Sequence, residues 1–116
     1  NLFVTVIGVP IRNKSNVKCG MVMDFGDLKE IVNNEIIEKF DHSVIFNKNS
    51  PHKELANNLI SSGHKVIMAD YQPTIEQMVI DFASKIIPKL PENIKLYSLK
   101  LEETETSYSE WFASDN

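Results

Sequence analysis

The chain has 116 residues, of which 42% are hydrophobic and 24% charged, and its formal net charge is −4. This length and composition predict one ordinary globular domain, and the scattered lysines and arginines exclude a basic nucleic-acid footprint. No apolar run approaches the length that spans a membrane. A single cysteine, Cys19, excludes an internal disulfide and is typical of a reducing compartment, so we expect a cytoplasmic protein.

The first predicted element is a strand over residues 2–9, which are rich in β-branched and apolar side chains and are followed by Pro10. Both of its faces are apolar, with Leu2, Val4 and Val6 on one and Phe3 and Ile7 on the other. Helices can cover only one face of a sheet in so small a domain, so we expect the other to contact a second subunit. Because the strand begins directly at Asn1, we also expect further residues upstream of this sequence.

A hairpin and a helix are predicted next. Residues 11–18 are polar and turn-like, and residues 19–25 predict a second strand that pairs with the first. Residues 27–40 place apolar side chains at helical spacing behind an acidic start, which predicts a helix. Residues 40–47 show no clear period.

The second half predicts two helices and two strands. A short helix is expected over 51–62 and a short strand over 66–68. The clearest helix covers 75–87, because its apolar residues form an almost complete stripe. Residues 94–103 predict the last long strand. This order of elements predicts an α+β domain with helices packed on an antiparallel sheet.

The last strand carries the most informative carboxylate. Tyr97, Leu99, Leu101 and Glu103 share one parity, so a regular strand would aim all four side chains at one face. A buried carboxylate is costly unless hydrogen-bond donors meet it. Either Glu103 ends the strand in solvent, or it lies in a pocket and accepts paired hydrogen bonds from an amidine-like ligand edge. Together with the segments below, the sequence favours the pocket.

Two further features could carry chemistry. Asp41 and His42 follow the end of a predicted helix, where a carboxylate can orient an imidazole that relays protons, although a solvated pair is the alternative. Thr74 and Gln77 have capping-box spacing, and a helix N-terminus can also bind polar ligand atoms. No two histidines have metal-ligand spacing, and Cys19 is interpreted as a small strand residue and not a nucleophile.

Four segments resemble signature segments of one family, in this order: CGMVMDFGDLKEIV, FDHSVIFN, PTIEQMV and LKLEETETSYSEW. The family is the 6-pyruvoyl-tetrahydropterin synthase and 6-carboxytetrahydropterin synthase group, and the resemblance covers the chain from Leu2 to Trp111. It implies that residues 1–116 form a single domain with the tunnelling fold, a four-stranded antiparallel sheet with helices on one face. Such domains trimerise into a barrel and often pair into hexamers, so a homotrimer or homohexamer is expected.

The resemblance also implies an activity, that of a zinc-dependent carbon–oxygen lyase. Family members eliminate triphosphate from dihydroneopterin triphosphate and rearrange its side chain. By position, His42 would be the relay histidine and Asp41 its orienting acid. Glu103, the third catalytic candidate, would anchor the pterin through its N3–H and 2-amino group. Thr74 and Glu76 are expected near the pterin pocket.

One departure from the family concerns the metal. The zinc histidines and the catalytic cysteine of the family precede the first strand, so zinc ligands are expected upstream of Asn1 and none is assigned within the chain. Residues 51–74 resemble bacterial members, which favours a 6-carboxytetrahydropterin synthase in the route to 7-deazaguanine compounds such as queuosine. A 6-pyruvoyl product and a catalytically inactive pterin-binding protein remain the alternatives.

Overall fold

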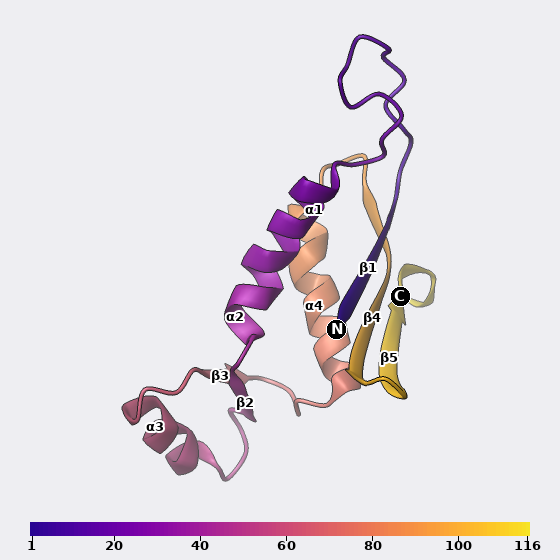
Figure 1. The fold of residues 1–116 in the computed structure, drawn as a ribbon. Helices are drawn as coiled ribbons and strands as arrows, with labels where there is room; N and C mark the ends of the chain where they lie inside the picture. The colour runs from indigo at the N-terminus through magenta and orange to yellow at the C-terminus, as the bar shows by residue number, and fades with distance from the viewer.

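The computed structural model describes residues 1–116 and places long helices on one side of a small sheet (Figure 1). Its strands are β1 (Leu2–Ile7), β2 (Val44–Asn47), β3 (Val66–Ala69), β4 (Lys95–Thr104) and β5 (Ser107–Phe112). Its helices are α1 (Phe25–Val32), the π-helical turn η1 (Asn33–Ile37), α2 (Glu38–Phe40), α3 (Lys53–Ser61), α4 (Ile75–Ile86) and the 3₁₀ turns η2 (Ile87–Lys89) and η3 (Ala113–Asp115). None of these helices combines the length and apolar character needed to cross a lipid bilayer.

The main sheet is antiparallel, with the strand order β1-β4-β5. In its centre, Leu99 on β4 lies opposite Val4 on β1 and Trp111 on β5. Leu99 and Trp111 are buried in the core that also contains residues of α4. The prediction of an α+β domain with helices against an antiparallel sheet is therefore confirmed.

The predicted strand over 19–25 is wrong. Gly20 has a φ of 90°, which belongs to the left-handed region and interrupts an extended strand. Asp24 accepts a hydrogen bond from the Gly26 N–H at 2.7 Å and caps α1, so the helix begins where the strand was expected to end. Ile11 makes only two backbone hydrogen bonds with this loop, of 2.8 and 2.9 Å.

The third strand of the sheet is instead β5, which the sequence analysis did not predict. It pairs with β4 across a two-residue turn at Glu105 and Thr106. The main sheet of the single chain thus has three strands where four were expected.

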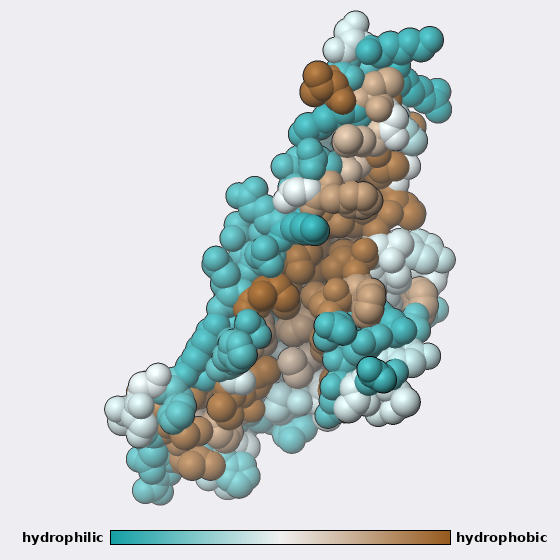
Figure 2. Space-filling model, viewed as in Figure 1, coloured by the Kyte–Doolittle hydropathy of each residue, from teal (hydrophilic) through white to brown (hydrophobic).

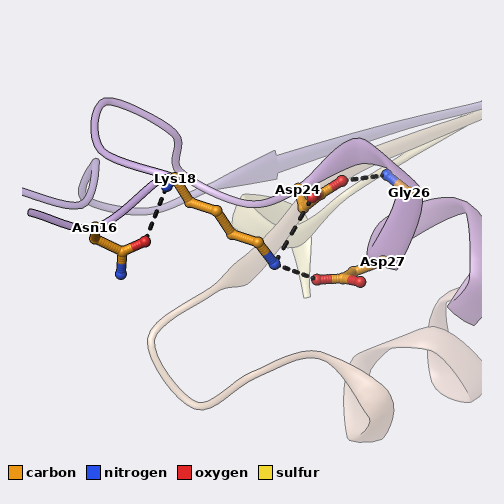
Figure 3. Close-up of polar contacts among 5 residues, drawn as sticks. All are labelled: Asn16, Lys18, Asp24, Gly26 and Asp27. Carbon is orange, nitrogen blue, oxygen red and sulfur yellow. Dashed lines mark hydrogen bonds and ion pairs between the residues drawn. The ribbon is translucent and has the colours of Figure 1, made fainter.

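An ion-pair cluster ties the β1–α1 loop to the start of α1 (Figure 3). The Lys18 ammonium lies 3.7 Å from a carboxylate oxygen of Asp24 and 3.5 Å from one of Asp27. The backbone N–H of Lys18 donates to the Asn16 side chain at 2.9 Å. Both carboxylates also lie at the positive end of the helix dipole, so their interaction with α1 is favourable in its own right.

The core lies between α4 and the inner face of the sheet. It consists of Ile36, Val79, Phe82, Ala83, Ile86, Leu96, Leu99 and Trp111. The rings of Phe40 and Phe82 meet edge to face, with their centroids 4.9 Å apart. The predicted helix over 75–87 is confirmed as α4, and its apolar stripe supplies half of this core.

A second, smaller unit carries α3 at one end of the molecule (Figure 1). β2 and β3 pair in parallel, from Val44 opposite Val66 to Asn47 opposite Ala69, and α3 is the crossover that a parallel pair requires. The predicted short helix and short strand are confirmed as α3 and β3. β2 lies within residues 40–47, where the order of apolar and polar residues showed no clear period.

The single chain is elongated and thinly packed. Its Cα radius of gyration is 17.1 Å, whereas a compact domain of this length has about 13 Å. Only 12 of 116 residues are buried. Phe3 and Ile7 on the outer face of β1 are about half exposed, whereas Leu2, Val4 and Val6 pack against the core. Both faces of β1 are therefore apolar, as predicted, and Figure 2 shows hydrophobic surface along the middle of the visible face.

Candidate active site

Asp41 and His42 form the two central positions of a tight turn between α2 and β2. Asp41 has φ −63° and ψ 131°, and His42 has a φ of 55°. The Ser43 N–H donates to the Phe40 carbonyl at 3.2 Å and closes the turn. This is the geometry of a type II turn, whose third position favours glycine because φ is positive there. A histidine at that position is held against its backbone preference.

The structure brings the two predicted relay residues together. His42 Nε2 lies 3.6 Å from Asp41 Oδ2, which is an ion-pair contact longer than a hydrogen bond. The His42 side chain is 93% exposed. In the single chain water therefore screens the pair, and a covering surface would be needed for Asp41 to control the imidazole strongly.

Lys65 holds this turn in place, and the sequence analysis missed it. Its ammonium donates to the carbonyl oxygens of Glu38 and Asp41, the latter at 3.2 Å. A cation at the C-terminal end of a helix satisfies carbonyls that have no partner within the helix and interacts favourably with the helix dipole. No local pattern predicts this contact, because Lys65 precedes β3 and meets α2 only through the tertiary fold.

Glu103 lies at an irregularity of β4, and the parity argument for its direction is wrong. The register shifts at Thr5–Val6, opposite Tyr97, so that Leu96 and Leu99 are both buried while Tyr97 is exposed. A second shift leaves Glu103 between the paired residues Glu102 and Thr104. A β-bulge adds one residue to a strand and reverses the alternation beyond it. Glu103 is exposed in the single chain, and its pterin-binding role stays a prediction.

Thr74 has the capping role that its spacing predicted. Its Oγ1 accepts a hydrogen bond from the Gln77 N–H at 3.3 Å at the start of α4. Glu76 lies exposed in the first turn of the same helix. Whether Thr74 and Glu76 also meet a ligand stays a prediction.

The elements that carry the predicted site residues end or begin in the same part of the fold. The helix α1–α2 and the strand β4 run toward this part, and α4 starts there (Figure 1). The Asp41–His42 turn follows α2, Thr74 and Glu76 lie at the start of α4, and Glu103 lies near the end of β4.

The chain's own residues do not fit a zinc ion. No group of three or more His, Cys, Asp or Glu side chains gathers as a metal would require. Cys19 is exposed on the β1–α1 loop, far along the chain from the three histidines.

Comparison with known proteins identifies the family. The family model described as 6-pyruvoyl tetrahydropterin synthase matches residues 4–113, nearly the whole chain. The chain belongs to this family. Among its relatives in the 6-pyruvoyl tetrahydropterin synthase family is the 6-carboxy-5,6,7,8-tetrahydropterin synthase of Rickettsia bellii, 33% identical over 108 residues. That match covers 90% of this chain and 77% of the relative.

Two further family members carry the same name. The Rickettsia conorii protein is 33% identical over 108 residues, with 90% of this chain and 77% of the relative covered. The Haemophilus influenzae protein is 31% identical over 99 residues, with 84% of this chain and 69% of the relative covered. The predicted membership of the tetrahydropterin synthase family is thus confirmed.

Proposed function

We propose that this protein is a 6-carboxy-5,6,7,8-tetrahydropterin synthase that acts on dihydroneopterin triphosphate. The observation that carries the proposal is the similarity over about nine-tenths of the chain to relatives that bear this name. Its place would be the cytoplasmic route to 7-deazaguanine compounds such as queuosine. The α+β fold, with helices on one side of an antiparallel sheet, supports the proposal.

In this function the chain's own residues would bind the pterin and move a proton. Glu103 would accept hydrogen bonds from the pterin N3–H and 2-amino group, a charge-assisted pair. Asp41 would orient the imidazole of His42 through Nε2, which leaves Nδ1 of His42 to exchange a proton with the substrate side chain. Thr74 and Glu76 would line the pterin pocket from the start of α4.

The proposed active unit is a homotrimer or homohexamer. The exposed apolar side chains of Phe3 and Ile7, and the exposed state of His42, support this assembly. A neighbouring subunit on the outer face of the sheet would bury apolar surface that the helices leave uncovered. Water would then be excluded from a site that the single chain leaves open.

We also propose that the protein works with zinc, and the family membership supports this proposal. Removal of metal with a chelator should lower turnover, and added zinc should restore it. Full turnover by the metal-free protein would contradict the proposal.

Product analysis tests the proposed function. The protein is incubated with dihydroneopterin triphosphate, and the products are separated and identified by mass. We expect 6-carboxytetrahydropterin. Accumulation of 6-pyruvoyltetrahydropterin would support that alternative, whereas binding of the pterin without any turnover would indicate an inactive pterin-binding protein.

A further inference from the structure

The peptide group between Asp41 and His42 decides the type of the turn that joins α2 to β2. Type I and type II turns share the hydrogen bond that closes them, here from the Ser43 N–H to the Phe40 carbonyl, and differ by a half-rotation of their central peptide. In a type I turn His42 would have a φ of about −90°, which costs a non-glycine residue less than a positive φ. The observed φ of 55° therefore requires a contact that favours the other orientation.

Lys65 makes a hydrogen bond to the carbonyl of that peptide. Its ammonium donates to the Asp41 carbonyl oxygen at 3.2 Å and also to the Glu38 carbonyl oxygen. In a type I turn the Asp41 carbonyl would point to the opposite side of the turn, and this hydrogen bond would be lost. A hydrogen bond from a charged donor is stronger than one between neutral groups. The contact therefore stabilises the type II turn selectively.

The backbone of Lys65 is itself held by the fold. Its carbonyl accepts a hydrogen bond from the Val44 N–H at 2.9 Å, so it is paired with the chain directly after the turn. Just beyond β3, the Tyr71 hydroxyl donates to Asp81 on α4 at 2.7 Å. Burial, followed by this hydrogen bond, raises the pKa of Tyr71, so the phenol stays protonated and remains a donor. The strand that follows Lys65 is thus anchored at both ends.

We propose that Lys65 is a positioning residue for His42. Its ammonium holds the Asp41–His42 peptide in the type II orientation and thereby sets the direction of the imidazole. Rotation of this peptide changes the φ of His42 and moves its side chain relative to Asp41, whose Oδ2 lies 3.6 Å from Nε2 of His42. The chemical role of the positioned imidazole rests on the proposed function, in which it moves a proton.

Nuclear Overhauser effects within the turn test the proposal without any substrate. In a type II turn the Hα of Asp41 lies close to the His42 N–H, whereas in a type I turn the two N–H groups lie close together. The parent protein should show the first pattern and Lys65→Met the second, because methionine keeps the backbone pairing but has no ammonium. Lys65→Arg keeps a charged donor and should keep the type II pattern. Lys53→Met makes the same charge change at an exposed position on α3 and should also keep it.

Lys65→Gln provides a second uncharged variant in case Lys65→Met does not fold. A type II pattern that persists in a folded, uncharged variant would overturn the proposal. Loss of the type II pattern in Lys53→Met would overturn it as well, because the turn would then respond to a charge that does not contact it.

Steady-state kinetics measure the consequence for turnover. Lys65→Met should lower kcat about tenfold to a hundredfold, since a displaced group loses the geometry that its reaction requires, and Lys65→Arg should retain most of the activity. In a His42→Ala background, Lys65→Met should have little further effect, because no imidazole remains to be positioned. An unchanged kcat, or an equal fall in both backgrounds, would overturn the positioning role. Absence of turnover in the parent protein would remove the proposed function, whereas the turn geometry would still decide whether Lys65 positions His42.

Discussion

At the scale of single residues, His42 combines a side chain with a proposed catalytic role and a backbone conformation that favours glycine. Its φ of 55° suits glycine, yet the chain has an imidazole there. Non-glycine residues in this region cost of order 1–3 kcal/mol and cluster at functional sites. The turn is fixed by the Ser43 and Lys65 contacts with the end of α2. The backbone strain is consistent with the proposed functional role of His42, which stays a prediction.

The relay role of His42 predicts a separation of turnover from stability. His42→Gly should lower kcat about a hundredfold to ten-thousandfold, the usual contribution of a positioned acid or base. Its free energy of unfolding should be equal to or greater than that of the parent, because glycine relieves the backbone strain. His42→Ala is the control that removes the imidazole but keeps the strain. Steady-state kinetics that show an unchanged kcat in both variants would make Asp41–His42 a solvated pair.

Tyr71 predicts a loss of stability in alkaline solution. Its pKa is raised in the folded state, so its proton is held more tightly there than in the unfolded chain. Stability from this group is therefore present below the unfolded pKa of about 10 and is lost as pH rises above it. Tyr71→Phe should reduce the fall in the free energy of unfolding between about pH 9 and 11. Denaturant titrations measure the fall, and exposed Tyr108→Phe should leave it unchanged.

At the scale of elements, periodic apolar patterns predicted helices and strands correctly wherever packing of one face decides the structure. The stripe of α4 and the alternation of β1 both survive in the fold. The apolar patterns failed where contacts between residues far apart in the sequence decide the structure. The bulge opposite Thr5–Val6 changes which β4 residues face the helices, and no local signal marks it. β5 has two serines and one glutamate among its three aromatic residues, so its alternation is weak, and β2 is stabilised by pairing with β3.

The residues of the candidate site were predicted only where the family resemblance or a local sequence motif points to them. Asp41 and His42 lie together because they are neighbours in sequence, and Thr74 caps α4 because capping is local. Lys65 was missed because it lies just before β3 and its contacts reach the end of α2, which is distant in sequence. The exposure of Glu103 was missed because a strand irregularity broke the assumed parity.

α4 allows a matched test of its buried stripe. Ile86 is fully buried and Ile80 is 48% exposed on the same helix. Ile86→Ala should destabilise the fold by about 2–5 kcal/mol, because it removes buried methyl groups and leaves a cavity. Ile80→Ala should cost much less, since its side chain already contacts solvent. Equal losses of the free energy of unfolding in the two variants, measured by chemical denaturation, would show that α4 packs through another face, or that Ile80 is buried by a partner subunit.

At the scale of the whole molecule, the chain is elongated, with a small core and an apolar outer face. Its length of 58 Å against widths of 30 and 26 Å leaves a core of few residues. The outer face of the sheet adds exposed Phe3, Ile7, Tyr97 and Tyr108. Burial of such a face against another copy would supply hydrophobic stabilisation that the single chain lacks.

Sedimentation tests this interpretation. We expect a trimer or hexamer at micromolar concentration, because the outer face of β1 should be covered. Phe3→Lys should shift the distribution toward smaller species, since it puts a charge into the proposed interface. Glu92→Lys, at an exposed position between α4 and β4, makes a charge change elsewhere and should have no effect. A stable monomer in the parent protein would contradict the assembly.

Calorimetric measurement of pterin binding is the most direct test of the central claim. The claim is that this chain is a pterin-converting enzyme whose proposed site includes Glu103. The parent protein should bind a pterin, and Glu103→Gln should weaken binding at least about tenfold, because the amide offers one acceptor oxygen and turns a donor toward the ligand. Glu102→Gln, at the neighbouring position, should have little effect. No pterin binding by the parent protein, or equal affinity in the parent protein and Glu103→Gln, would contradict the account.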